Sequence, residues 1–242
     1  MNRGVLREIL NLFSASLWVV ASVGLLWRSP WLVALALGLG SWGMLRIWAS
    51  PVDRVVFGVA AVLGVFGELL CTARGTCYWI YAPGVCSFGL SIPFWLPLVW
   101  GFLMLLFHRA GKVLAPLAAP LRWPLLLGIL GFLLALPALV APLFVHQAVL
   151  AAYGVFVGAM LFRWNTAEDA LTCWAGGLMG TFGEYLCIRF GIWHYPDRAW
   201  DLPWLFGPGT VPMPATLPLA WGLAAVIVHQ VAGWIVDRRG ER

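Results

Sequence analysis

Long apolar segments alternate with short polar connections along the whole chain. Each segment has roughly 17 to 24 residues, which is enough for a helix to cross a hydrocarbon core of about 30 Å. The eight segments are 10–27, 31–48, 55–72, 92–108, 124–140, 143–162, 170–189 and 212–235. The pattern therefore predicts an all-α polytopic membrane protein with about eight transmembrane helices.

Composition and charge agree with this class. Of the 242 residues, 62% are hydrophobic and 10% are charged, against roughly 25% charged residues in soluble domains. With eight spans and both termini in the cytoplasm, 11 of the 15 Lys and Arg residues fall on the cytoplasmic side. We therefore expect a bacterial inner membrane protein whose main surroundings are the lipid bilayer, and the net charge of +5 requires no nucleic-acid partner.

The sequence repeats itself at a shift of 116 positions, which aligns 44–48 with 160–164 and 66–71 with 182–187. Further matches follow after small changes of the shift. They align 79–81 with 193–195, 93–101 with 214–222, and finally His108 with His229. Ordered matches of Asp, Glu, Gly, Trp, Tyr, Pro and His are not expected from chance similarity between apolar segments. We interpret them as two tandem four-helix repeats, 1–115 and 116–242, in parallel orientation.

Polar residues of the two copies fall into two layers. Asp53 and Glu68 are fifteen residues apart, about 22 Å along a helix, so the glutamates lie toward the outer side. The outer layer contains Glu68 and Glu184 with the matched aromatic residues Trp79, Tyr81, Trp100, Trp193, Tyr195 and Trp221. The inner layer contains Asp53, Asp169, His108 and His229.

Two interpretations stay open for each layer. Ionisable residues inside a membrane are costly and often functional, but Glu68 and Glu184 also stand close to Arg74 and Arg189, with which ion pairs would brace the helix ends. Glycines on the same helical face as the glutamates favour close helix contact and turn the carboxyl groups toward protein. The inner aspartates stand at helix starts, where a carboxylate meets free amide groups, so we favour a structural role for the inner layer.

The cysteines give no metal-binding pattern. Cys77 and Cys86 lie in the third connection, on the outer side, where oxidising conditions allow disulfides. A disulfide between them and two free thiols both stay open. The remaining cysteines fall within helices, where small buried hydrophobic side chains are usual. The sequence also contains no nucleotide-binding glycine loop and no haem motif, so we expect no metal and no cofactor.

The second copy resembles an integral membrane carotenoid-biosynthesis family that includes the bisanhydrobacterioruberin and gamma-carotene hydratases. The shared pattern is a Glu followed seven residues later by Gly, an aromatic stretch with Tyr, a Gly-Pro loop and a Pro-Leu-Ala-Trp segment that opens the next helix. It is carried by Glu184, Gly191, Tyr195, Gly207-Pro208, Pro212 and Leu217-Pro218-Leu219-Ala220-Trp221. A thinner version in the first copy comprises Glu68, Gly75, Tyr81, Pro93 and Pro97-Leu98-Val99-Trp100.

A more distant similarity links the stretch that begins at Gly191 to membrane lycopene cyclases. The paired carboxylates that those enzymes carry after the proline are absent, because Met213, Pro214 and Ala215 stand there. The resemblance implies a long isoprenoid ligand, a carotenoid or a similar chain, rather than a particular substrate.

Two classes of function follow. In the first, Glu184 is the catalytic acid that protonates a terminal double bond, after which water adds (a lyase-type hydratase) or the chain cyclises (an isomerase). Glu68, with its aromatic neighbours, forms either a second catalytic site or a relic of one. The six matched aromatic residues bind substrate, and their π faces stabilise a carbocation. In the second, the protein is a proton-coupled transporter or a non-enzymatic accessory subunit that binds lipid or pigment beside other membrane proteins.

Overall fold

The described part of the chain is mostly helical. The computed structural model describes residues 3–72, 79–86, 89–118, 166–195 and 217–239. Its helices are α1 (Arg3–Leu26), α2 (Pro30–Ile47), α3 (Pro51–Thr72), α4 (Leu96–Ala118), α7 (Ala167–Ala175), the π-helical turn η1 (Gly176–Gly180), α8 (Thr181–Arg189) and α10 (Leu217–Arg239). Two short strands complete it, β1 (Ile80–Tyr81) and β2 (Trp193–His194). The predicted spans 124–140 and 143–162 lie outside the described residues.

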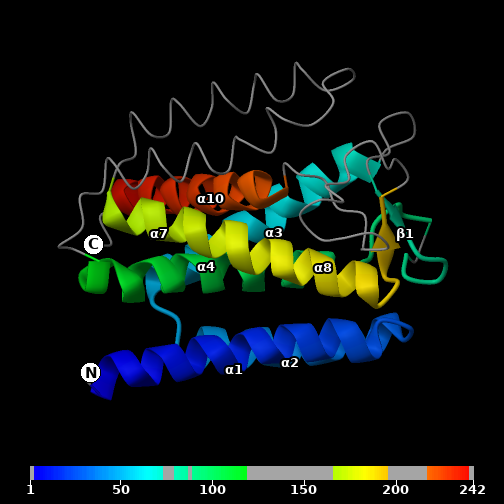
Figure 1. Ribbon diagram of the computed structural model, residues 1–242, viewed down its shortest axis with the longest axis horizontal. Helices are drawn as coiled ribbons and strands as arrows, with labels where there is room; N and C mark the ends of the chain where they lie inside the picture. Colours follow the sequence, from blue (N-terminus) through cyan, green and yellow to red (C-terminus); the bar gives the residue numbers. More distant parts are fainter. Residues whose placement is uncertain (1–2, 73–78, 87–88, 119–165, 196–216, 240–242) are drawn as a thin grey trace, which may run out of the picture.

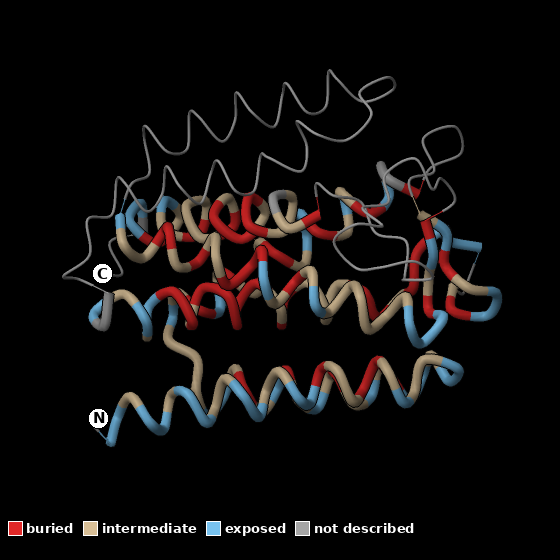
Figure 2. Tube along the Cα trace, viewed as in Figure 1, coloured by how far each residue is buried: buried red, intermediate tan, exposed pale blue. Residues whose placement is uncertain are grey.

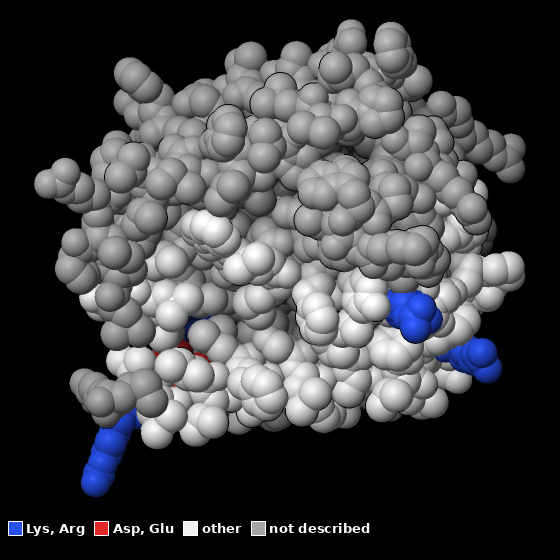
Figure 3. Space-filling view, in the orientation of Figure 1, with Lys and Arg blue, Asp and Glu red and all other residues white. Residues whose placement is uncertain are grey.

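Four of the described helices are long and apolar enough to cross a membrane. They are α1, α2, residues 96–116 of α4 and residues 220–238 of α10. Large apolar side chains such as Phe13, Leu35 and Phe66 point outward and are more than half exposed, and Figure 3 shows few charged groups on the described surface. The predicted class, a helical membrane protein, agrees with these features, since lipid accepts an apolar surface that water does not.

The helices run lengthwise beside one another, with α1 and α2 forming a layer on one side of α3, α4, α7, α8 and α10 (Figure 1). Both chain ends lie at one end of the bundle, and β1 lies at the other (Figure 1). Helix α4 supplies much of the core, because Phe102, Leu105 and Phe107 are at most 1% exposed. Buried positions concentrate where the helices face one another, as the colouring of Figure 2 shows.

Helix boundaries differ from the hydropathic segments for physical reasons. Helix α4 begins at Leu96 and continues ten residues beyond His108, and α1 begins at Arg3 rather than residue 10. A hydropathic segment ends where charge begins, but Arg and Lys are good helix formers, so the helix itself continues. The predicted span 170–189 is a longer helix interrupted by the π-turn η1, which hydropathy does not reveal.

Helix starts in the two halves use the same local chemistry. Thr166 caps α7 and accepts a hydrogen bond from the Asp169 amide at 3.1 Å, while its hydroxyl donates to the Asp169 carboxylate at 2.6 Å. Ser50 and Asp53 make the corresponding contacts at the start of α3, at 3.3 and 2.6 Å. This reciprocal capping satisfies free amide groups at each helix start and agrees with the structural role expected for the aspartates.

Two glycines allow large rings to lie directly against the helix backbone. A Cβ atom at Gly64 would overlap the ring of Trp100, and one at Gly180 would overlap the ring of Trp221. At Gly67, one turn further along α3, nothing lies within 4 Å of an added Cβ. The contact of α3 with α4 therefore requires the missing side chain at Gly64 but not at Gly67.

We expect Gly64→Ala to lower the free energy of unfolding by roughly 1–3 kcal/mol, because the added methyl forces Trp100 out of position. The matched control Gly67→Ala adds the same methyl into open space and is expected to stabilise by up to about 1 kcal/mol through helix propensity. Thermal unfolding of both variants in the same detergent measures the difference. Equal melting temperatures would contradict the close helix contact.

Candidate functional site

The Glu68 carboxylate is held by three aromatic hydrogen-bond donors. Trp79 Nε1 and the Tyr81 hydroxyl donate to Oε2 at 3.0 and 2.9 Å, and Trp100 Nε1 donates to Oε1 at 3.2 Å. Glu68 is 8% exposed and lies near the end of α3, while its donors come from the β1 segment and from α4. A buried carboxylate with three donors is a well-satisfied polar group in apolar surroundings.

Glu184 occupies a similar environment in α8. Trp193 Nε1 donates to Glu184 Oε2 at 2.7 Å, and the Tyr195 hydroxyl donates to the same oxygen at 3.4 Å. Gly180, one turn earlier, lies against the ring of Trp221. Trp221 contributes a third side-chain hydrogen bond to this carboxylate, so Glu184, like Glu68, has three aromatic partners, and its bond from Tyr195 is the longest of those measured at 3.4 Å.

A two-stranded antiparallel ladder brings the two sets of donors together. Ile80 pairs with His194 and Tyr81 pairs with Trp193, and the Ala82 amide donates to the Ile192 carbonyl at 2.8 Å. Side chains alternate along a strand, so the aromatic donors share one face of the ladder, and the exposed Ile80 and His194 face the other way.

Aromatic pairs connect the two halves across this ladder. The ring centroids of Tyr81 and Trp193 are 5.6 Å apart, and those of Trp79 and Tyr195 are 6.1 Å apart, both in edge-on geometry. Below them Trp100 and Trp221 stack with centroids 4.9 Å apart. All six aromatic residues predicted from the sequence therefore gather around the two glutamates.

One cavity of about 60 Å³ is lined by both glutamates. Its other walls include Val19, Val23 and Gly24 of α1 together with Phe190, which directly follows α8, and the rings of Trp100 and Trp221. The volume is about four times the roughly 15 Å³ that one water requires, so the cavity has room for a few waters or for one end of an apolar chain. The two glutamates thus line one cavity, whereas a second site or a relic was expected around Glu68, and nothing in the sequence indicated the α1 wall.

The ion pairs considered as an alternative do not account for Glu184. Arg189 is exposed, and the salt bridges of the described residues do not join it to Glu184. Arg74 lies outside the described residues, so the corresponding pair with Glu68 stays a prediction. The partners that the structure gives to both glutamates are aromatic N–H and O–H groups.

Two side chains in the connection between α3 and α4 keep their protons. Burial, followed by the nearby charge of Glu68 and the hydrogen bond to it, raises the pKa of Tyr81 well above its usual value, so the phenol remains a donor. Burial, and then the charge of Glu68, raises the pKa of the Cys86 thiol to about 11. Cys86 is a free thiol in the structure, and its possible disulfide partner Cys77 lies outside the described residues.

The inner layer of the first half is centred on Asp53, which is 1% exposed. Its Oδ2 accepts a hydrogen bond from Arg109 at 2.5 Å, and its Oδ1 lies 3.4 Å from His108 Nε2. Arg109 also donates to the Trp48 carbonyl at 2.7 Å and to Glu8 at 3.1 Å. The inner aspartate therefore lies beside a histidine of the same predicted layer, and the contribution of Arg109 was not expected from the sequence.

The second half repeats this arrangement with one exchange. Asp169 Oδ1 lies 3.7 Å from His229 Nε2, and it accepts a hydrogen bond of 2.5 Å from Gln230. Gln230 follows His229 in the chain as Arg109 follows His108, so an amide stands where the first half has a guanidinium.

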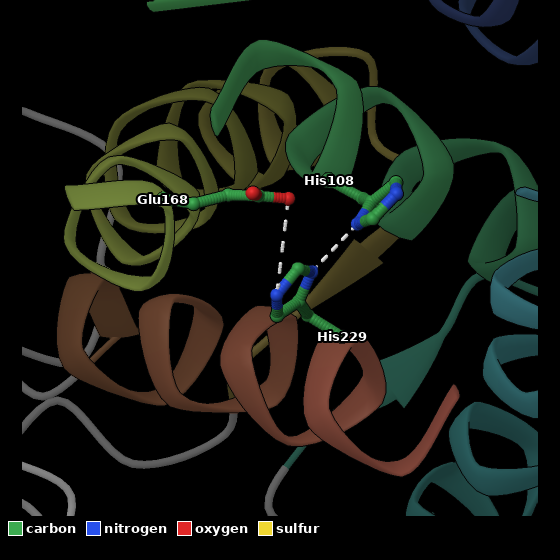
Figure 4. A group of neighbouring side chains, drawn as sticks. All are labelled: His108, Glu168 and His229. Carbon is green, nitrogen blue, oxygen red and sulfur yellow. Dashed lines mark hydrogen bonds and ion pairs between the residues drawn. The ribbon is translucent and has the colours of Figure 1, made fainter. Parts of the chain in front are cut away.

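His108 and His229 meet between α4 and α10, with their Nδ1 atoms 2.6 Å apart (Figure 4). Glu168 Oε1 lies 3.9 Å from His229 Nε2 (Figure 4). His108, His229 and Glu168 are residue types that bind metals, and one atom of each lies within 4.8 Å of the others. Linear spacing gave no sign of this group, because its members come from three helices.

Comparison with known proteins gives no match, since no family model, no curated protein and no solved structure matches the chain.

Proposed function

We propose that the chain forms eight transmembrane helices in two tandem four-helix repeats, with both termini in the cytoplasm of a bacterial inner membrane. The support is that the same contacts occur twice. Gly64 on Trp100 corresponds to Gly180 on Trp221, and the Ser50 and Thr166 caps are 116 residues apart. Arg3 and Arg238 stand at the end of the bundle that holds both chain termini (Figure 1), as the positive-inside rule requires of a cytoplasmic end.

For the activity, we propose acid-type hydration or cyclisation at one end of a long, carotenoid-like isoprenoid. The observation that carries this proposal is a single small cavity that two carboxyl groups share with stacked tryptophan rings. A volume of about 60 Å³ suits a terminal prenyl group rather than a whole carotenoid, so the remaining chain would extend into the lipid along the apolar faces of α1 and α8.

The two glutamates suit different steps of this reaction. An anion with a weaker hydrogen bond is stabilised less, so Glu184, whose bond from Tyr195 is 3.4 Å long, is the better acid and Glu68, with bonds of 2.9 to 3.2 Å, the better base. The Glu184 O–H bond breaks as a C–H bond forms at the terminal alkene, leaving a tertiary carbocation. Water then forms the C–O bond and loses its proton to Glu68, or an internal double bond forms a C–C bond that closes a ring, and the resulting cation loses a proton to Glu68. Trp100 and Trp221 offer π faces to the cation.

The second candidate is a proton-coupled carrier. The observation that favours it is the chain of ionisable groups in the inner layer, which links both halves at the end of the bundle opposite the glutamates. Ionisable chains inside membranes serve as proton relays in pumps and transporters. An accessory, pigment-binding subunit needs neither feature and would tolerate loss of both carboxylates.

The test combines extraction and turnover. Protein purified in mild detergent is extracted with organic solvent for mass spectrometry and absorption, and membranes are then supplied with an acyclic carotenoid. We expect a product that gains one water, or an isomer of unchanged mass. Glu184→Gln should reduce its formation at least roughly 100-fold, the scale of general acid catalysis. The control Glu168→Gln removes a carboxylate of the inner layer and should leave it unchanged.

Unchanged product formation after Glu184→Gln and Glu68→Gln together would refute the acid role. A preparation without isoprenoid, whose proteoliposomes acidify only when both glutamates are present, would favour the carrier. Stoichiometric co-purifying membrane proteins, with no effect of either substitution, would favour the accessory subunit.

A further inference from the structure

The two inner histidines are held face to face by buried carboxylates. His108 Nε2 lies 3.4 Å from Asp53, and His229 Nε2 lies 3.7 Å from Asp169. Asp53, Asp169 and His108 are at most 3% exposed. These contacts are longer than hydrogen bonds, and His108 Nε2 and Asp53 Oδ1 have no hydrogen-bond partner among the described residues, but the negative charge of each aspartate favours the hydrogen on the nearer Nε2 atom and leaves Nδ1 as an acceptor.

The tautomers set by the aspartates leave a lone pair on each Nδ1 atom. These two atoms are 2.6 Å apart, and two lone pairs at this distance repel each other unless a cation lies between them. The site is therefore built to bind a cation between the rings, and a proton and a metal ion are the two classes to compare.

The distance favours a proton. Two imidazole ligands of one tetrahedral metal ion, with bonds of about 2.0–2.1 Å, hold their nitrogens roughly 3.3 Å apart, whereas a short hydrogen bond matches 2.6 Å. The nearby carboxylate of Glu168 faces His229 Nε2 at 3.9 Å, on the far side of the ring from the Nδ1 pair (Figure 4). It is not positioned to complete a coordination shell with both Nδ1 atoms.

Charge supports the same choice. The buried groups around the pair are the anions Asp53 and Asp169 and the cation Arg109, which is 14% exposed, so neutral rings would leave one uncompensated negative charge. The other charged groups nearby are more solvated and comprise Glu8, Glu168 and Lys112. One added proton makes the buried set neutral, which removes the cost of an unpaired internal charge.

We propose that His108 and His229 hold one proton between their Nδ1 atoms and thereby form a proton relay, Asp53–His108–His229–Asp169, between the two halves of the protein. In the transfer step the N–H bond on one Nδ1 breaks as the N–H bond on the other forms. The imidazolium charge then moves from the Asp53 side to the Asp169 side, and no other reactant is needed. This inference is independent of the isoprenoid chemistry.

The test is NMR of the full-length protein, labelled with ¹⁵N-histidine and held in lipid nanodiscs. The chain has four histidines, so the spectrum is simple. We expect a strongly downfield proton that correlates with the Nδ1 atoms of His108 and His229. His229→Asn places an amide near the former Nδ1 and should abolish this signal, whereas His194→Asn, at an exposed position, should leave it unchanged.

Metal analysis of the same sample separates the two cations. A stoichiometric transition metal, with both Nδ1 atoms unprotonated, would overturn the proposal in favour of a metal site. Two neutral rings without a downfield proton would overturn it as well. The wild-type spectrum decides both outcomes, so the test holds even if His229→Asn fails to fold.

Discussion

Replacing Arg109 by alanine is expected to lower the free energy of unfolding by about 3–5 kcal/mol, the usual cost of breaking a buried ion pair from one side. The Asp53 carboxylate, 1% exposed, would lose its guanidinium partner. The Trp48 carbonyl and Glu8 would lose a donor in the same step, so the attachment of α1 and α2 to the remaining helices weakens as well.

The second half of the protein provides the matched control for this change. Gln230 donates to Asp169 from the position that corresponds to Arg109, so Arg109→Gln keeps one neutral donor and is expected to cost less than alanine. Arg54→Ala changes an exposed arginine and should stay within about 0.5 kcal/mol. Denaturant titration in one detergent measures all three, and equal stability of the Arg109→Ala and Arg54→Ala proteins would contradict the ion pair.

Glu68→Ala is the second change with a large expected effect. It leaves Trp79, Tyr81 and Trp100 without their acceptor in a buried setting. Each unsatisfied buried donor costs about 1–3 kcal/mol, so we expect a loss of at least about 3 kcal/mol. Glu184→Ala also removes an acceptor, but its hydrogen bond from Tyr195 is already 3.4 Å long, so this change should cost less.

Thermal unfolding of these two alanine variants shows whether the loss of stability follows the hydrogen bonds of each carboxylate or only its burial. Glu68→Gln keeps one acceptor oxygen and is expected to fall between wild type and Glu68→Ala. Tryptophan fluorescence is a second measurement, because Trp79 and Trp100 donate directly to the carboxylate. A Glu184→Ala protein less stable than Glu68→Ala would contradict the expected order.

Sequence patterns predict the helices and the membership of the outer layer because both depend on local or repeated signals. Apolar segments of membrane length mark α1, α2, α3, α4 and α10 to within several residues at most ends. Glu68 and its aromatic donors were found because the same residue types recur in order around Glu184. Matched positions in two copies suggest matched surroundings, and the hydrogen bonds of the two glutamates agree with this.

Contacts between distant segments were not predictable in the same way. The α1 wall of the cavity consists of Val19, Val23 and Gly24, which look like any lipid-facing residues in a sequence. The repeat relates His108 to His229 but does not say that they touch. Arg109 is one of many basic residues in the chain, and nothing in its sequence position indicated its contacts with Asp53 and Glu8.

The ladder between β1 and β2 also has a consequence for the order of folding. It joins residues 80–81 to residues 193–194, so it cannot form during synthesis until more than a hundred further residues have been made. Glu68 can collect Trp79 and Tyr81 early, because these contacts are local in sequence. Contacts of long sequence separation form late, so closing of the ladder is expected to be the event that commits the two halves to one another.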